Sequence, residues 1–150
     1  MKVLMLGPQG SGKSTQGKLL AEFLDVPYIS TGETFRKMAG QDDEVGERVK
    51  GLLDQGQLVD DDLTAEVVKK RLNQKDCSAG FVMDGYPRTL QQVEVFDPGF
   101  EIVIYLDISD EEATNRLFKR KREDDTLELI QERLTIYHRE TEPLLKYYDE

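Results

Sequence analysis

The chain has 150 residues, enough for one domain with a substantial core and too few for two. Its formal net charge of −10 argues against a nucleic-acid partner, because a surface for nucleic acid concentrates lysine and arginine. The single cysteine excludes an internal disulfide and a four-cysteine zinc site, and no apolar run is long enough for a signal peptide or a membrane span. We therefore expect a cytoplasmic protein that acts without nucleic acid, membrane or zinc.

The start of the chain predicts a strand, a glycine-rich loop and a helix in direct succession. An apolar run at 2–6 precedes Gly-Pro-Gln-Gly-Ser-Gly-Lys-Ser at 7–14, which fits the phosphate-loop pattern, and 13–24 has apolar side chains at helical spacing. Backbone N–H groups in such a loop surround phosphate oxygens, and the helix adds the positive end of its dipole. The alternative is a plain glycine-rich turn, which the preceding strand argues against. We assign a nucleoside triphosphate to Gly10, Ser11, Gly12, Lys13, Ser14 and Thr15.

Three further apolar runs alternate with helical patterns, at 27–30, 81–84 and 102–106. Such alternation is typical of a parallel sheet in an α/β fold. The second and third strands of the chain are separated by about fifty residues patterned as helices, which is enough for a small helical insertion. We place this insertion at 30–60, within a single domain that spans 1–150.

The C-terminal part of the chain is expected to consist mainly of helices, at 89–96, 109–119 and 126–148. In the last of these, Pro143 is expected to produce a kink. His138 is expected on the solvent side of the same helix, as a surface histidine.

Further motifs follow the phosphate loop in a fixed order. They are 30–36 (Ser-Thr-Gly-Glu-Thr-Phe-Arg), 56–59 (Gly-Gln-Leu-Val), 84–92 (Asp-Gly-Tyr-Pro-Arg-Thr-Leu-Gln-Gln), 116–120 (Arg-Leu-Phe-Lys-Arg), 122–125 (Arg-Glu-Asp-Asp), 133–137 (Arg-Leu-Thr-Ile-Tyr) and 141–144 (Thr-Glu-Pro-Leu). Together with the loop they resemble the adenylate kinases, a family of nucleoside monophosphate kinases, over the whole chain. The resemblance implies a three-layer P-loop fold, with a doubly wound parallel sheet of strand order 2-3-1-4 and nucleotides at the carboxyl ends of the strands. It also implies a reversible, Mg²⁺-dependent reaction in which ATP and AMP become two ADP.

The basic residues of these motifs fit the transfer of a phosphoryl group, which needs charge neutralisation and positioning more than a nucleophile or a strong base. By resemblance, the residues around the transferred group are Lys13, Arg120, Arg122 and Arg133. Arg36 and Arg88 would hold the phosphate of the acceptor, and Arg88 is counted with the catalytic residues. The alternative for a lone arginine is a solvated charge paired with one of the 30 acidic residues.

The identity of the acceptor base rests on fewer residues. Thr31 and Gln92 resemble the adenylate kinase residues at positions that touch this base, where pyrimidine monophosphate kinases tend to carry alanine and asparagine. Gln92 could offer its amide to the adenine edge, and the alternative is an exposed helix glutamine. The residues assigned to AMP are Thr31, Arg36, Gln57, Val59, Gly85, Arg88, Gln92, Arg122 and Arg133.

Asp84 ends an apolar strand, where a carboxylate is unfavourable unless it is paired or serves an ion. By resemblance it lies on the magnesium side of ATP and orients waters on the metal, while Ser14 supplies an oxygen. The alternative is a structural aspartate that caps the following turn. Mg²⁺ with ATP is the expected cofactor.

The adenine of ATP is assigned to Arg116, whose guanidinium would stack on the base, with Arg120 also counted in the ATP site. The alternative for Arg116 is an ion pair with Glu112 at the i, i+4 spacing of a helix.

Two features depart from the family pattern. A single residue separates Arg120 from Arg122, so we expect a minimal lid at 119–126, and which phosphate each arginine reaches stays open. A solvated charge run is the alternative for this segment. The family continues beyond the position of Glu150 into a fifth strand and a final helix, so we expect a shortened chain whose fourth strand has an open edge and whose ATP binding is weakened.

The resulting hypothesis is a monomeric enzyme that binds ATP, AMP and ADP. One alternative is a UMP/CMP-type monophosphate kinase on the same scaffold. The other is a nucleotide-binding module without turnover, which the retained basic residues and Asp84 argue against.

Overall fold

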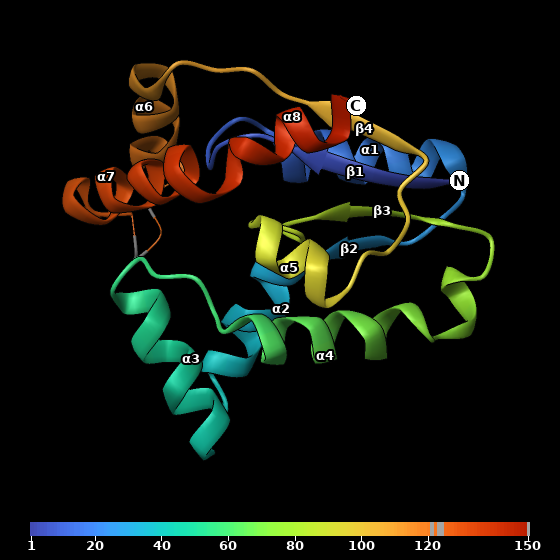
Figure 1. The fold of residues 1–150 in the computed structure, drawn as a ribbon. Helices are drawn as coiled ribbons and strands as arrows, with labels where there is room; N and C mark the ends of the chain where they lie inside the picture. Colours follow the sequence, from blue (N-terminus) through green and yellow to red (C-terminus); the bar gives the residue numbers. More distant parts are fainter. Residues whose placement is uncertain (121, 123–124, 150) are drawn as a thin grey trace.

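The computed structural model describes residues 1–120, 122 and 125–149, and a parallel four-stranded sheet lies at its centre (Figure 1). The strands are β1 (Lys2–Leu6), β2 (Tyr28–Ser30), β3 (Phe81–Asp84) and β4 (Ile102–Tyr105). Their order is β2-β3-β1-β4, and each neighbouring pair is parallel. The predicted α/β fold and strand order are therefore confirmed.

Helices cover both faces of the sheet. The helix α1 (Lys13–Leu24) packs against the face that holds Val3 and Val82, and α4 (Asp61–Leu72) packs against the face that holds Met83. Adjacent residues of a strand point to opposite faces, so Val82 and Met83 belong to different layers of the core. Both are 0% exposed, as expected for a central strand that reads as an unbroken apolar run.

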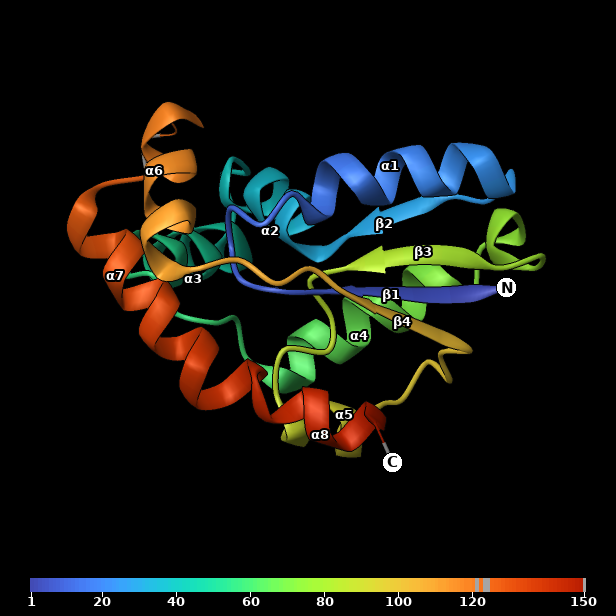
Figure 2. The same cartoon turned by 90° about the horizontal axis from the view of Figure 1, so that it is seen from above.

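The remaining helices are α2 (Thr31–Ala39), α3 (Glu44–Asp54), α5 (Leu90–Val95), α6 (Asp110–Arg120), α7 (Leu127–Ile136) and α8 (Pro143–Asp149), with a short 3-10 turn at Lys75–Cys77. Figure 2 shows the strands pointing toward the side of the molecule where α2, α3, α6 and α7 gather. The carboxyl ends of the strands therefore face these helices. In the described ranges, none of the helices combines the length and the apolar character needed to cross a membrane.

The helices α2 and α3 form a small unit beside the sheet, and Figure 1 shows α3 standing away from the strands. This unit has its own apolar cluster, centred on Phe35, Val49 and Val59. The start of α3 is fixed by a cap, in which the Asp43 Oδ1 accepts the N–H of Gly46 at 2.6 Å. The local core and cap explain how this part of the crossover, unlike α4, can fold without lying on the sheet.

The end of the chain differs from the expected single helix over 126–148. The helix α7 ends at Ile136, a π-helical turn follows at Tyr137–Thr141, and α8 starts at Pro143. In the wider turn the N–H of Glu142 bonds to the carbonyl oxygen of Tyr137 at 2.8 Å. A proline has no N–H to donate and its ring crowds the preceding turn, so the interruption comes before Pro143.

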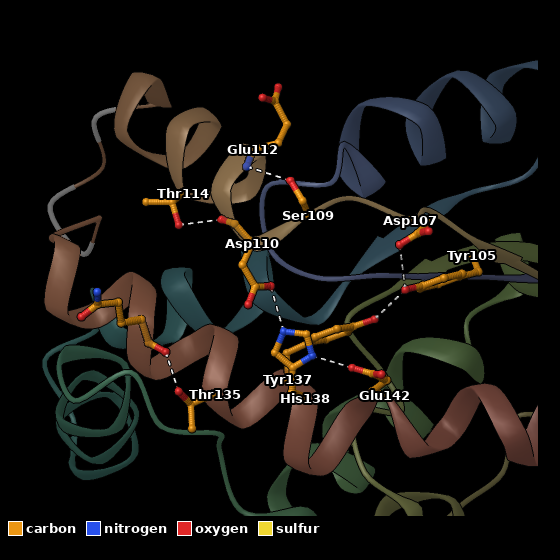
Figure 3. A network of polar contacts seen from close by, with 11 residues as sticks. Tyr105, Asp107, Ser109, Asp110, Glu112, Thr114, Thr135, Tyr137, His138 and Glu142 are labelled. Atoms are coloured by element: carbon orange, nitrogen blue, oxygen red, sulfur yellow. Dashed lines mark hydrogen bonds and ion pairs between the residues drawn. The ribbon is translucent and has the colours of Figure 1, made fainter.

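His138 lies in this π-helical turn and contacts two carboxylates, one from α6 and one at the end of the turn itself (Figure 3). Its Nε2 is 2.8 Å from the Asp110 Oδ1 at the start of α6, and its Nδ1 is 2.5 Å from the Glu142 Oε2. The hydrogen bonds with Glu142 and Asp110 raise the pKa of His138, because both favour the imidazolium. His138 is at the surface, as predicted, and it also ties α6 to the segment between α7 and α8.

The raised pKa of His138 predicts a pH-dependent contribution to folding stability. A folded pKa above that of the unfolded chain gives stability that is fully present below the unfolded value, about 6.5, and is lost as the pH rises through the folded value. We expect His138→Gln to lower the Tm more at about pH 6 than at about pH 9. Asp110→Asn should show the same trend, since it removes one of the two partners. An equal loss of Tm at both pH values would contradict the assignment.

Candidate active site

The loop at 7–12 leads from β1 into α1 and has the geometry of an anion site. Gly10 and Gly12 have φ angles of 81° and 94°, which favour glycine, and a Cβ at Gly10 would meet the carbonyl oxygen of Ala113 at 2.9 Å. No side chain caps α1 at Gly12, so the N–H groups of its first turn can face an anion. The Oγ of Ser11 is buried without a hydrogen-bond partner, and Thr15 is exposed in the first turn.

Lys13 folds back over this loop. Its Nζ donates to the carbonyl oxygens of Gly7 at 2.8 Å and Pro8 at 2.9 Å. Burial lowers the pKa of Lys13 to about 8, Asp84 opposes this shift, and nearby arginines add to it. A phosphate chain at the loop would favour the charged ammonium, so the charge balance of the site suits an anionic ligand.

Asp84 ends β3 between the carboxyl ends of β1 and β2, and it is 6% exposed. Its Oδ2 accepts hydrogen bonds from the Ser14 Oγ at 3.1 Å and from the Tyr28 hydroxyl at 2.9 Å. The two residues assigned to the metal are therefore in direct contact. Hydroxyl and carboxylate oxygens are ligands that suit Mg²⁺.

Tyr28 is a member of the site that the sequence interpretation missed. Its ring packs closely against α1 at Gly17, where an added Cβ would come within 2.8 Å of the ring. The Nζ of Lys18 lies 5.5 Å from the ring centroid. The alternation along β2 was the available signal, since Tyr28 and Ser30 share a face and pair with Val82 and Asp84 of β3.

A pocket of about 90 Å³ lies between α2, the segment before α4, the segment that follows β3, and α7. Its basic residues are Arg36, Arg88, Arg120, Arg122 and Arg133, and its apolar residues include Phe35, Leu53, Val59 and Ile136. Gln57, Gly85 and Gln92 also line it. The structure thus brings together every residue predicted for the acceptor except Thr31. An apolar wall beside clustered cations fits a ligand with a flat base and a phosphate.

Thr31 lies behind the pocket wall. It is 2% exposed, its Oγ1 has no hydrogen-bond partner, and a Cβ at Gly85 would come within 2.4 Å of that oxygen. Glycine at position 85 therefore lets the chain pass close to Thr31.

Gln92 is buried, so the alternative of an exposed helix glutamine is wrong. It is 2% exposed, and its Oε1 accepts the backbone N–H of Arg88 at 2.6 Å. The Arg88 Nε donates to the carbonyl oxygen of Gly85 at 3.0 Å. Burial lowers the pKa of Arg88, Asp84 opposes the shift, and Arg133 adds to it. Gln92 thus holds the segment that carries Arg88 while it lines the pocket.

Asp125 forms ion pairs with a basic residue of α6 and a basic residue of α7. Its Oδ1 and Oδ2 accept from the Arg120 Nη2 at 2.6 Å and the Arg120 Nε at 2.7 Å, a bidentate pair. The Arg133 Nη1 donates to Oδ1 at 3.1 Å, and the backbone N–H of Arg122 donates to Oδ2 at 3.3 Å. The carboxylate is 1% exposed. Arg120 therefore pairs with a buried carboxylate, while its own side chain is 30% exposed.

The sequence interpretation gave Asp125 no role, although it lay within a quoted motif. Burial raises the pKa of Asp125, but the hydrogen bonds and charge of Arg120, with Arg133, hold it below its usual value. The available signal was a carboxylate among several arginines of one motif.

Two predicted contacts have other geometry. The Arg116 Nε pairs with the Glu112 Oε1 at 2.9 Å on the exposed side of α6, the alternative stated for it, and Arg116 lines neither the pocket nor the cavity beneath the loop. The Gln57 Nε2 donates to the Glu132 Oε1 at 3.0 Å, which joins the helical insertion to α7. Of the predicted lid at 119–126, residues 121, 123 and 124 lie outside the described part.

Comparisons with known proteins agree with this geometry. The sequence model of the family described as Adenylate kinase matches residues 5–150. A protein named Adenylate kinase from Mycobacterium ulcerans (strain Agy99) is 44% identical over 156 aligned positions, which cover 99% of this chain and 86% of the relative. Its namesake from Corynebacterium aurimucosum is 42% identical over 155 positions, covering 99% and 86%, and that from Cyanothece sp. (strain PCC 7425) is 40% identical over 158 positions, covering 98% and 81%. The chain therefore belongs to the adenylate kinase family.

Proposed function

We propose that the chain catalyses the reversible transfer of a phosphoryl group from ATP to AMP, with formation of two ADP. One observation carries this proposal: the cavity beneath the phosphate loop, which Lys13 lines, and the arginine-lined pocket share Gln9, Gly85 and Arg88. A donor at the loop and an acceptor in the pocket would meet at this common wall. The names of the relatives support the same reaction.

In this reaction an oxygen of the AMP phosphate attacks the γ-phosphorus of ATP, and the bond from that phosphorus to the β-bridging oxygen breaks. Lys13 would neutralise the donor phosphates and Arg88 the acceptor phosphate. Arg120 and Arg133, oriented by Asp125, would neutralise the group in transfer. The attacking oxygen is already anionic, so positioning and charge compensation suffice without a general base.

Mg²⁺ is the cofactor that we propose, held by Ser14 and, through water, by Asp84. Their side-chain oxygens lie 3.1 Å apart, which suits the oxygen ligands of Mg²⁺. In the part of the chain that the structure describes, no group of three or more histidine, cysteine, aspartate or glutamate side chains could hold a metal. When bound, the ion would supply positive charge that compensates the charge of the ATP phosphates.

The helical insertion at 30–60 is proposed to carry the acceptor, and the segment at 119–126 to form a short lid. The separate apolar cluster of α2 and α3 supports the first assignment. Closure of both segments would exclude water from the reacting groups. We also propose that the enzyme acts as a monomer in the cytoplasm, where its single free cysteine would stay reduced.

The test of the proposed function is acceptor-dependent ADP formation from ATP and Mg²⁺, measured separately with AMP, UMP, CMP and GMP. We expect AMP to give the highest kcat/KM. A preference for UMP or CMP would instead support the pyrimidine alternative. Nucleotide binding without turnover on any acceptor would support the non-catalytic module.

Arg88→Ala tests the acceptor side of the site. Loss of a charged hydrogen-bonding group should raise the KM for AMP and lower kcat, with a fall in kcat/KM of about tenfold to a hundredfold. Steady-state kinetics with AMP varied at saturating ATP measure this effect. Arg139→Ala, which removes an exposed arginine paired with Glu140, is the matched control. An unchanged dependence on AMP in the Arg88 variant would remove Arg88 from the acceptor site.

Asp125→Asn tests the carboxylate between the arginines. The neutral amide removes the buried negative charge that pairs with both Arg120 and Arg133, so we expect a lower kcat and a loss of about 1 to 3 kcal/mol in stability. Added inorganic phosphate should raise the Tm of this variant more than that of the parent, because the anion can replace the carboxylate. Asp42→Asn is the control at an exposed acid. Equal phosphate effects on both proteins would show that Asp125 does not organise the arginines.

A further inference from the structure

Gln9 lies at the junction of the two halves of the proposed site. It is in the phosphate loop between Pro8 and Gly10, and it is a lining residue both of the arginine-lined pocket and of the cavity that Lys13 lines. Of the described residues, Gly85 and Arg88 are the others that line both spaces. Gln9 is therefore the part of the shared wall that the phosphate loop contributes.

The side-chain amide of Gln9 is not fully hydrogen-bonded. Its Oε1 is buried and has no hydrogen-bond partner. A buried polar atom without a partner is unfavourable, so it is uncommon unless a ligand or a functional state supplies the partner. The oxygen and nitrogen of a glutamine amide exchange places by rotation about its last side-chain bond, so the NH₂ group can also take the position of the unpaired oxygen.

The surroundings decide what kind of partner suits this amide. Five arginines line the pocket, and among the described residues that line it there is no aspartate or glutamate. Asp125, the nearby buried carboxylate, accepts from Arg120 and Arg133. An anion is therefore the expected occupant, and the NH₂ group is the part of an amide that donates to an anion.

We propose that the side-chain NH₂ of Gln9 donates a hydrogen bond to the phosphoryl group as it passes from donor to acceptor. This inference rests on the proposed function. Gln9 would act as a catalytic residue, because its donor would touch the reacting group itself, while Arg88 holds the acceptor's own phosphate. A neutral donor adds to the arginines without increasing their mutual repulsion.

This role of Gln9 predicts that its substitution changes kcat much more than KM. In Gln9→Ala, kcat should fall about tenfold to a hundredfold while the KM values for ATP and AMP change less than about threefold, because the lost contact is strongest in the transition state. The kcat of Gln9→Glu should be lower still, since a carboxylate repels the phosphoryl oxygens. Gln9→Asn keeps the amide on a shorter stem and should lie between parent and alanine. Gln91→Ala, an exposed glutamine on α5, is the matched control.

A binding measurement provides the second readout. Calorimetry with ADP, AMP, Mg²⁺ and aluminium fluoride, which takes the place of the transferred group, should show weaker binding by Gln9→Ala, by a factor similar to the loss in kcat. Without fluoride, the affinities of the two proteins for ADP and AMP should match. The Tm of the ligand-free variant should equal or exceed that of the parent, because the change removes an unpaired polar atom.

The outcomes separate the inference from the function on which it rests. A parent enzyme that transfers phosphoryl groups, together with a Gln9→Ala enzyme of equal kcat and equal fluoride-dependent affinity, would overturn the role of Gln9 alone. A rise in the KM for AMP with unchanged kcat would also overturn it, because Gln9 would then bind the acceptor's ground state. A parent without acceptor-dependent turnover would overturn both proposals.

Discussion

Positive charge crowded at the carboxyl ends of the strands is the constraint on which the rest of the site depends. Lys13, Arg88 and Arg133 are brought together by β1, β3 and α7, and burial together with mutual repulsion lowers the pKa of Lys13 and of Arg88. Asp84 and Asp125 are the buried carboxylates among the described residues, and each faces part of this charge. A phosphate chain would relieve the remaining repulsion, so anion binding and stability should be coupled.

The two carboxylates organise different halves of the site. Asp84 is fixed at the end of β3 by the hydroxyls of Ser14 and Tyr28, next to the phosphate loop. Asp125 pairs with Arg120 of α6 and with Arg133 of α7, and so brings the two guanidinium groups to one place. The guanidinium groups are thereby ordered before a ligand arrives, which reduces the ordering that the reaction itself would require.

Features that depend on local sequence patterns could be predicted from the sequence, whereas contacts that depend on how the helices and strands pack together could not. The four strands and the phosphate loop follow from apolar runs and glycine spacing, both of which act over a few residues. The partners of Asp125 depend on how α6 meets α7, and those of His138 on how α6 meets the π-helical turn. The burial of Gln92 likewise depends on how α5 docks, so its side chain could not be distinguished from an exposed one. The register of β2 against β3, which brings Tyr28 to Asp84, is also a long-range property.

The central claim is that the phosphate loop and the arginine-lined pocket form one continuous site, joined at Gln9, Gly85 and Arg88. A crystal structure with Mg²⁺ and diadenosine pentaphosphate, in which one phosphate chain joins two adenosines, tests it most directly. The account predicts that a single molecule contacts Lys13 with one end of its phosphate chain and Arg88 with the other, with the second adenosine beside Val59 and Gln92. A ligand whose second adenosine lies outside this pocket would contradict the claim.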